Sequence, residues 1–281
     1  MLTDAQFDRS RRLALKLAGI ELCDRHRELL DRRGRRVGVR DSAGLDSLLG
    51  AAEEGETTAR QKLVCLLTTK FTGFFRHPRH VEIAAEHALL AADRRGRARL
   101  WSAAAATGEE PYSLAMKLIE VFRRDNPPAN VLATDIDVEA LAVAKQGEYG
   151  ELALRSLEPA RRERFLSAAG VARRWCMAPA VRRLVEFRAL NLASEAWAVE
   201  GPLDVIFCRN VLMYLETRHR YAVLERIASL LASDGLLILD PAEHLGKAGH
   251  WFTPAANGVY SGRRTTFPQS GVARVSGIPH R

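Results

Sequence analysis

Apolar residues in the first quarter of the chain follow helical spacing. They fall in three stretches, around residues 13–20, 45–49 and 63–67, and glycines separate one stretch from the next. Apolar positions three or four residues apart indicate amphipathic helices, and the alternation typical of a strand is not evident in this part of the sequence. The pattern predicts a small all-helical domain over residues 1–75.

Beyond residue 99 the pattern changes to short apolar runs that alternate with helical segments. A helix predicted at residues 80–92 leads into this region. Strands are predicted at residues 99–103, 130–135, 202–208 and 236–239. Helices are predicted at residues 111–122, 138–145 and from 217 to about 234. Thr217 is expected to cap the last helix at its start, and Gly235 to end it. Such alternation is typical of an α/β fold with a mostly parallel sheet covered on both faces. We therefore predict a second, α/β domain over residues 76–281.

Two segments of this second domain depart from the alternating pattern. Residues 151–190 contain a basic stretch and end in a strand-like run, and we expect them to form a small inserted subdomain. Residues 264–281 are rich in Gly, Ser and Pro and contain few apolar side chains, so we expect a mobile tail.

The composition is that of an ordinary globular protein, with 47% hydrophobic and 27% charged residues. No apolar run approaches the roughly 18 residues that span a bilayer, and the first residues lack the apolar segment of a secretory signal. We expect a cytoplasmic protein without direct membrane insertion. The four cysteines and eight histidines are scattered, without the spacing of metal ligands, so no metal is expected. A net charge of +8 suits an acidic partner, which could be nucleic acid, an anionic membrane or a protein surface.

The loop from Ser102 to Glu110 is the first candidate for chemistry. It follows a predicted strand and precedes a predicted helix, where an open α/β sheet places its ligand crevice. The loop is not a GxGxxG motif, and it lacks the lysine of a P-loop. Glu109 and Glu110 lie where a pyrophosphate would rest, which favours a cationic cofactor such as S-adenosylmethionine. A tight turn before an acidic helix N-terminus explains the same pattern equally well.

Asp135 is the second candidate, at the end of the second predicted strand and about 25 residues past the loop. A carboxylate at this position can accept hydrogen bonds from ribose hydroxyls. The alternative is an acidic residue in a surface turn. Asp137 has a separate explanation, because it can cap the helix that begins at Val138.

These segments together resemble the CheR-type chemotaxis receptor methyltransferases. The matching segments are LAGIELCDRHRELLDRR (17–33), LLTTKFTGFFR (66–76), WSAAAATGEEPYSLAM (101–116), ATDID (133–137), NL (191–192) and CRNVLMY (208–214). They follow the family's order over nearly the whole chain. The resemblance implies a Rossmann-like methyltransferase domain, preceded by a helical domain, with S-adenosylmethionine as cofactor.

The resemblance also implies a role for each matching residue. Thr72 and Arg76 match positions that line the cofactor and catalytic pocket, and Glu110 matches a cofactor contact. Asp135 matches the ribose-binding acid, and Asn191 and Leu192 match the loop near the adenine. The remaining matches are Arg209 and Asn210 at the end of the fourth strand, and Tyr214 beside the transferring methyl.

The implied reaction is methyl transfer to glutamate side chains of chemoreceptors, in chemotactic adaptation. A glutamate, with a pKa near 4.3, is ionised at neutral pH and needs no general base. We therefore expect catalytic roles only for Arg76, which holds the substrate carboxylate or anchors the cofactor through Glu110, and for Tyr214, which orients the reacting groups.

One residue and two segments of the chain depart from the family pattern. Lys70 stands where the family usually has Asn, and the run Asp240-Pro-Ala-Glu243 replaces a Gly-His-Ser-Glu type run. Residues 151–190 align with the small β-subdomain that docks a receptor peptide in some members, but the glycines expected for docking are not evident. The sequence therefore does not predict a tethered peptide.

The basic residues of the helical domain leave two interpretations open. The run comprises Arg25, Arg27, Arg32, Arg33, Arg35, Arg36 and Arg40. It forms either a solvated helix face or a surface that steers the acidic cytoplasmic helical region of a receptor. It lacks interleaved aromatic residues, so no nucleic-acid partner is expected. The alternative to an active enzyme is a non-catalytic S-adenosylmethionine sensor or scaffold of the same fold.

Overall fold

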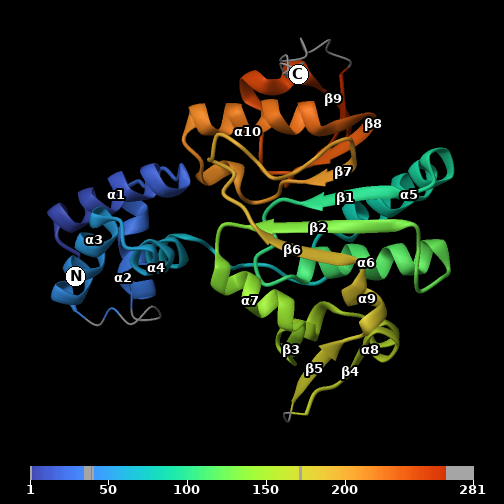
Figure 1. Ribbon diagram of the computed structural model, residues 1–281, viewed down its shortest axis with the longest axis horizontal. Coiled ribbons are helices and arrows are strands. Elements are labelled where there is room, and N and C mark those ends of the chain that lie inside the picture. Colours follow the sequence, from blue (N-terminus) through green and yellow to red (C-terminus); the bar gives the residue numbers. More distant parts are fainter. Residues whose placement is uncertain (1, 35–38, 40, 171–172, 264–281) are drawn as a thin grey trace, which may run out of the picture.

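The computed structural model describes residues 2–34, 39, 41–170 and 173–263. A cluster of helices formed by the N-terminal segment lies beside a larger body built around a sheet (Figure 1). Residues 264–281, for which we predict a mobile tail, lie outside the described residues. No helix in the described ranges is both long and apolar enough to cross a membrane.

Four α-helices form the N-terminal cluster, as the apolar spacing predicts. They are α1 (Asp4–Ala18), α2 (Arg27–Gly34), α3 (Ser42–Glu54) and α4 (Thr57–Leu67), with a short 3-10 turn η1 (Asp24–His26) before α2. Their apolar faces meet in one core that includes Phe7, Leu49 and Leu63. The predicted helical region is therefore confirmed in the described residues, whereas its boundary at residue 75 stays a prediction.

The large sheet has seven strands, and the chain order reverses at its first strand. The strands are β1 (Ala98–Ser102), β2 (Ala129–Asp135), β6 (Val185–Ala189), β7 (Leu203–Phe207), β8 (Leu231–Ile238), β9 (Phe252–Ala256) and β10 (Val259–Gly262). Their spatial order is β6-β2-β1-β7-β8-β10-β9, and the antiparallel pairs are those of β10 with β8 and β9. The predicted α/β class with a mostly parallel sheet is confirmed. The crevice of such a sheet lies at the carboxyl ends of the two strands where the order reverses, here β1 and β7.

Helices cover both faces of the sheet. One face packs on α5 (Pro78–Arg95) and α6 (Glu109–Phe122), and the other on α10 (Thr217–Leu230). The buried face of α5 consists largely of alanines, which let α5 approach α6 and β1 closely. The sheet therefore lies between two apolar layers, and the loops at the carboxyl ends of its strands start from fixed positions.

The prediction for the end of α10 is wrong. The helix ends at Leu230, its N-cap is Glu216 rather than Thr217, and Gly235 lies inside β8. The register between β7 and β8 shifts at this point, since Leu203 pairs with Leu231 but Val205 pairs with Leu236. A Cβ atom on Gly235 would lie 2.9 Å from the Leu203 carbonyl oxygen. This glycine is present because two strands meet closely at a bulge, and not because a helix ends.

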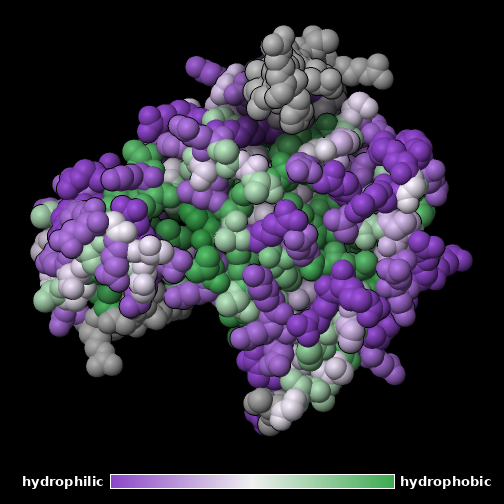
Figure 2. Space-filling model, in the orientation of Figure 1, coloured by the Kyte–Doolittle hydropathy of each residue, from purple (hydrophilic) through white to green (hydrophobic). Residues whose placement is uncertain are grey.

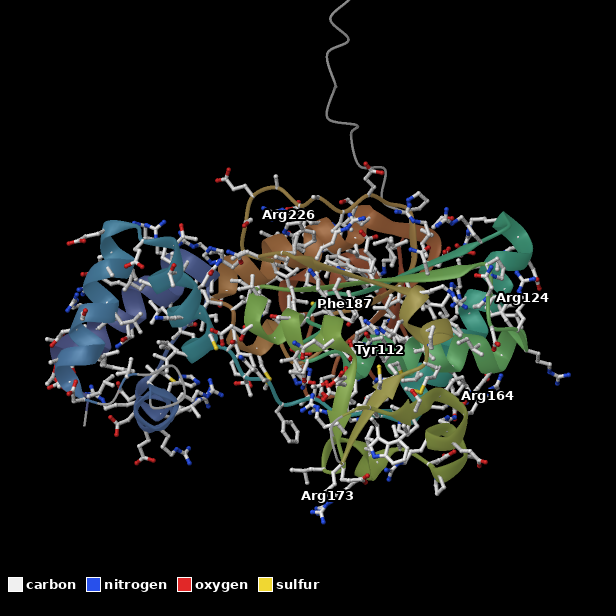
Figure 3. All side chains as sticks on the ribbon, turned by 60° about the horizontal axis from the view of Figure 1, so that its bottom comes forward. Tyr112, Arg124, Arg164, Arg173, Phe187 and Arg226 are labelled. Carbon is white, nitrogen blue, oxygen red and sulfur yellow. The ribbon has the colours of Figure 1, made fainter. Side chains whose placement is uncertain are left out.

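A second, three-stranded sheet projects from the main body (Figure 1). Its antiparallel strands are β3 (Glu148–Gly150), β5 (Arg174–Met177) and β4 (Leu166–Ala168), in that spatial order. The helices α7 (Val138–Gln146), α8 (Pro159–Phe165) and α9 (Pro179–Arg183) flank it along the chain, with η3 (Ala153–Ser156). Residues 151–190 hold most of this unit and also β6, which pairs with β2 in the large sheet. Phe187 of β6 packs its ring edge to face against the ring of Tyr112 on α6, with 5.5 Å between the ring centres (Figure 3).

Candidate active site

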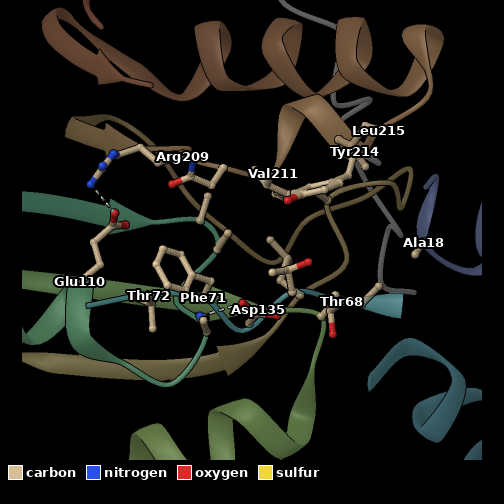
Figure 4. A pocket seen from close by; sticks show the side chains of 18 of the residues that line it. Ala18, Thr68, Phe71, Thr72, Glu110, Asp135, Arg209, Val211, Tyr214 and Leu215 are labelled. Atoms are coloured by element: carbon tan, nitrogen blue, oxygen red, sulfur yellow. Dashed lines mark hydrogen bonds and ion pairs between the residues drawn. The ribbon is translucent and has the colours of Figure 1, made fainter. Parts of the chain in front are cut away.

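A pocket opens at the carboxyl ends of β1, β2 and β7, next to the N-terminal helices (Figure 4). It encloses about 1070 Å³ of space not occupied by atoms, part of which is open solvent at its mouth. All nine residues predicted for the site line it: Thr72, Arg76, Glu110, Asp135, Asn191, Leu192, Arg209, Asn210 and Tyr214. Segments far apart in the chain thus converge on one cavity.

The N-terminal helices contribute a wall that the sequence does not predict. Ala18 and Ile20 line the pocket, and Ile20, after α1, forms an antiparallel bridge with Leu215. The Glu21 backbone N–H donates to the Tyr214 carbonyl oxygen at 2.9 Å. The surface view shows apolar side chains lining the hollow between the helical cluster and the sheet (Figure 2). Sequence spacing gave no signal for this contact, because it joins residues nearly 200 positions apart.

The loop after β1 is held by Asp135. The Asp135 side chain accepts hydrogen bonds from the backbone N–H groups of Ala106, at 2.8 Å, and Asp137, at 2.9 Å. Burial raises the pKa of Asp135, and these hydrogen bonds oppose the shift. Asp137 caps α7 as predicted, by accepting from Glu139 and Ala140. Asp135 therefore lies at the pocket wall with its orientation fixed by the backbone.

Glu110 forms an ion pair with Arg209, which Figure 4 shows as a dashed line. The two atoms, Glu110 Oε2 and Arg209 Nη1, are 3.1 Å apart, and Ser102 donates to Glu110 Oε1 at 2.8 Å. Burial raises the pKa of Glu110, and the charge of Arg209 opposes this shift. The ion pair of Glu110 is made by Arg209, whereas Arg76 acts on Glu110 only through its charge, which also opposes the shift. The role expected for Arg76 stays a prediction.

Arg76 lies instead near Asp240. Its guanidinium Nη2 is 3.9 Å from Asp240 Oδ2, and the group stands over the ring of Phe71, 5.3 Å from the ring centre. The Arg76 side chain is 32% exposed, whereas that of Arg209 is 2% exposed. Of the two arginines that line the pocket, Arg76 is therefore the more accessible to an incoming group.

Asn191 and Leu192 lie in the loop after β6 and line the pocket. The Asn191 amide donates to the Leu17 carbonyl oxygen at 2.7 Å and accepts from the Ala193 backbone N–H at 2.9 Å. Leu192 packs into the apolar layer that contains Trp101. The Asn191 side chain thus joins the N-terminal segment to the loop after β6.

Glu243 is a structural residue of the site that the sequence analysis did not select. Its buried carboxylate accepts backbone N–H groups of Asn210 at 2.8 Å, Val211 at 3.1 Å and Asp240 at 3.1 Å. Asn210 has a φ of 57°, in the left-handed region. The carboxylate thereby fixes the turn that carries Arg209 and leads to Tyr214. The sequence signal was the acidic end of the Asp240–Glu243 run.

Lys70 turns away from the pocket. Its ammonium lies 3.2 Å from Asp137 Oδ2 and 3.1 Å from the Cys65 sulfur. The lysine thus joins the linker after α4 to the N-terminus of α7. In this chain Lys70 forms an ion pair with Asp137, the N-cap residue of α7.

The polar groups of the pocket fit S-adenosylmethionine. Arg209 Nε, Arg209 Nη2 and Asp240 Oδ2 are buried and have no hydrogen-bond partner among the described residues. Buried polar atoms are normally satisfied, so these atoms indicate a polar ligand or water. Arg209 and Glu110 suit the carboxylate and ammonium of an amino acid, and Asp135 suits a ribose. The fold and this pocket together define an S-adenosylmethionine-dependent methyltransferase.

Comparison with known proteins identifies the family. Residues 70–260 match the family model described as CheR methyltransferase, SAM binding domain. Chemotaxis protein methyltransferase 2 of Pseudomonas aeruginosa is 36% identical over 268 residues, covering 92% of this chain and 93% of that protein. The chemotaxis protein methyltransferase of Escherichia coli is 36% identical over 270 residues, covering 92% and 91%. The chain belongs to the CheR methyltransferase family, its cofactor is S-adenosylmethionine, and the family's function is methylation in chemotaxis. A non-catalytic sensor or scaffold is not favoured.

Proposed function

We propose that the protein transfers the methyl group of S-adenosylmethionine to glutamate side chains of chemoreceptors, forming methyl esters. The observation that carries this proposal is the convergence of nine family-matching residues on one pocket, with a reachable guanidinium at Arg76. A glutamate carboxylate is already a nucleophile at neutral pH. The protein's contribution is to hold the two reactants in line and to exclude water.

Arg76 and Tyr214 are the residues that we propose to act on the acceptor. Arg76 can receive the acceptor carboxylate, because its partner Asp240 leaves part of the guanidinium exposed. Tyr214 lines the pocket, and the backbone contact from Glu21 fixes its position. A hydroxyl held in this way can donate a hydrogen bond to one carboxylate oxygen and leave the other free to attack.

The test of the function is the chemistry of the product. The protein is incubated with methyl-labelled S-adenosylmethionine and receptor-containing membranes, and the labelled fraction is treated with base. Glutamate methyl esters release methanol in base, so we expect volatile label from the receptor band. Label that resists base, or that is found in nucleic acid, would contradict the proposal.

Replacing Arg76 with alanine is expected to lower kcat/KM for the acceptor by about a hundredfold, the effect of removing one charged group that orients reactants. Since Glu110 keeps its partner Arg209, the Kd of the cofactor should change much less. Steady-state methylation and calorimetric binding measure the two effects. Arg76→Lys, which keeps the charge, should recover part of the rate. If Arg76→Ala methylates the receptor at the wild-type rate, Arg76 has no catalytic role.

The basic run near α2 supplies a second part of the proposal, the steering of an acidic receptor region. Arg27 pairs with Asp4 at 2.8 Å, and Arg33 donates to the Leu67 carbonyl oxygen at 3.1 Å. Arg25 and Arg32 are exposed. Arg35, Arg36 and Arg40 lie outside the described residues. Part of the run is thus engaged within the protein, and part remains at the surface for a partner.

Steering predicts that the methylation rate falls as salt rises, because exposed charges are screened beyond about 8–10 Å at physiological ionic strength. The double variant Arg25→Gln, Arg32→Gln should start at a lower rate and show a shallower salt dependence. The double variant Arg123→Gln, Arg124→Gln, just after the end of α6 (Figure 3 labels Arg124), removes the same number of exposed charges and is the matched control. A rate that is indifferent to salt would favour a merely solvated helix face.

A further inference from the structure

Asp240 is a buried carboxylate behind the two pocket arginines. It follows β8, and 7% of the residue is exposed. Its Oδ2 atom lies 3.7 Å from Arg209 Nη2, 3.9 Å from Arg76 Nη2 and 3.5 Å from His77 Nε2. Its Oδ1 atom accepts the Ala242 backbone N–H at 3.1 Å. The side chain is therefore oriented by the backbone, with one oxygen aimed at a group of cations.

Asp240 adds a negative charge to a set of charges that otherwise cancel. The carboxylates of Glu110 and Asp135 and the guanidinium groups of Arg76 and Arg209 line the pocket, which gives two negative and two positive charges. Burial lowers the pKa of His77, and the charge of Arg209 lowers it further, so this ring is neutral at pH 7. Burial alone would raise the pKa of Asp240, but the Ala242 hydrogen bond and the charge of Arg209 outweigh it and keep the carboxylate ionised. With Asp240 behind the two arginines, the protein presents five charges with a net charge of −1.

A net negative charge affects the affinities for the two forms of the cofactor differently. S-adenosylmethionine carries a sulfonium, an ammonium and a carboxylate, which give a net charge of +1. S-adenosylhomocysteine lacks the methyl group and the sulfonium charge, and its net charge is zero. The four lining charges alone have a net charge of zero and do not favour either ligand by charge. The additional carboxylate of Asp240 attracts the first ligand more than the second.

We propose that Asp240 is a positioning residue that holds Arg76 and Arg209 at the pocket and offsets their charge, so that the pocket accepts the cationic form of the cofactor. The position stands at the start of the Asp240-Pro-Ala-Glu243 run, where this chain departs from the family pattern. The proposal concerns the cofactor alone and does not depend on which acceptor is methylated.

The test compares the affinities of both cofactor forms in a variant that loses the charge and keeps the shape. Asp240→Asn retains an oxygen for the Ala242 N–H and leaves this group of charges with a net charge of zero. We expect the Kd of S-adenosylmethionine to rise roughly tenfold relative to that of S-adenosylhomocysteine, since a unit charge within about 10 Å acts at this strength in a protein. Isothermal titration calorimetry measures both constants. Asp240→Glu should keep the wild-type ratio.

Asp234→Asn is the matched control, because it removes the same charge from the far side of β8, where Asp234 pairs with Arg94 and Arg95. It should leave the ratio of the two constants unchanged. An equal loss of affinity for both ligands in Asp240→Asn would reduce Asp240 to a structural role and overturn the proposal. Unchanged affinities would overturn it as well. Neither result would bear on glutamate methylation, which is measured separately by base-labile label.

Discussion

Replacing Arg209 with methionine is expected to lower the free energy of unfolding by about 3–5 kcal/mol and to abolish measurable cofactor binding. The Arg209 side chain is almost fully buried between Glu110 and Asp240, at 3.1 and 3.7 Å. Methionine fills similar space but leaves both carboxylates without their nearest cation. An uncompensated buried charge of this kind typically costs about 3–5 kcal/mol. Urea unfolding monitored by circular dichroism, and calorimetric titration with S-adenosylhomocysteine, measure the two effects.

A second variant separates folding from binding. Glu110→Gln combined with Arg209→Met removes both charges of the pair, and glutamine can still accept from Ser102. This double variant should recover part of the lost stability, because Asp240 retains Arg76 and His77 as neighbours. It should not recover binding, since neither the ammonium nor the carboxylate of the cofactor finds its partner. Wild-type affinity in the double variant would show that the ion pair serves the fold alone.

The position of the site could be predicted from the sequence because the sheet topology determines it. An apolar run followed by a small-residue loop places that loop at the carboxyl end of a strand. The same logic applies to Asp135 after β2 and Arg209 after β7, so three separated motifs had to meet at one edge. The structure confirms that they do.

The partners within the site could not be predicted in the same way. Arg76 and Arg209 are chemically equivalent in a sequence, and Arg76 is closer in the chain to Glu110. The structure pairs Glu110 with Arg209, because β7 lies next to β1 in the sheet while Arg76 is carried by the linker before α5. The prediction that Gly235 ends a helix is wrong for a related reason. This glycine allows β7 and β8 to approach closely, and the pairing of these strands is not visible in the sequence. Short-range patterns identify elements, whereas side-chain partners depend on strand order.

Replacing Glu243 with alanine is expected to lower the free energy of unfolding by about 3 kcal/mol and the rate of methyl transfer by more than about a hundredfold. The carboxylate is 4% exposed and accepts four backbone N–H groups, those of Asn210, Val211, Met213 and Asp240. Alanine leaves these donors without an acceptor, and each unsatisfied buried donor costs about 1–3 kcal/mol before the loop relaxes. The left-handed backbone at Asn210 then loses its restraint, and Tyr214 loses its position.

Glu243→Gln is the informative control, because it keeps the size of the side chain and alters only its hydrogen bonding. The amide oxygen still accepts one or two of the four N–H groups, but the amide NH₂ faces the others as a second donor. We therefore expect glutamine to lie between wild type and alanine in both unfolding free energy and rate. The substitution should reduce the rate of methyl transfer more than the affinity for the cofactor. Glu110 and Asp135 are held by Ser102 and by the Ala106 backbone N–H, which the substitution leaves in place. If glutamine matches wild type in rate, the turn is held by its own backbone, and Glu243 does not position Tyr214.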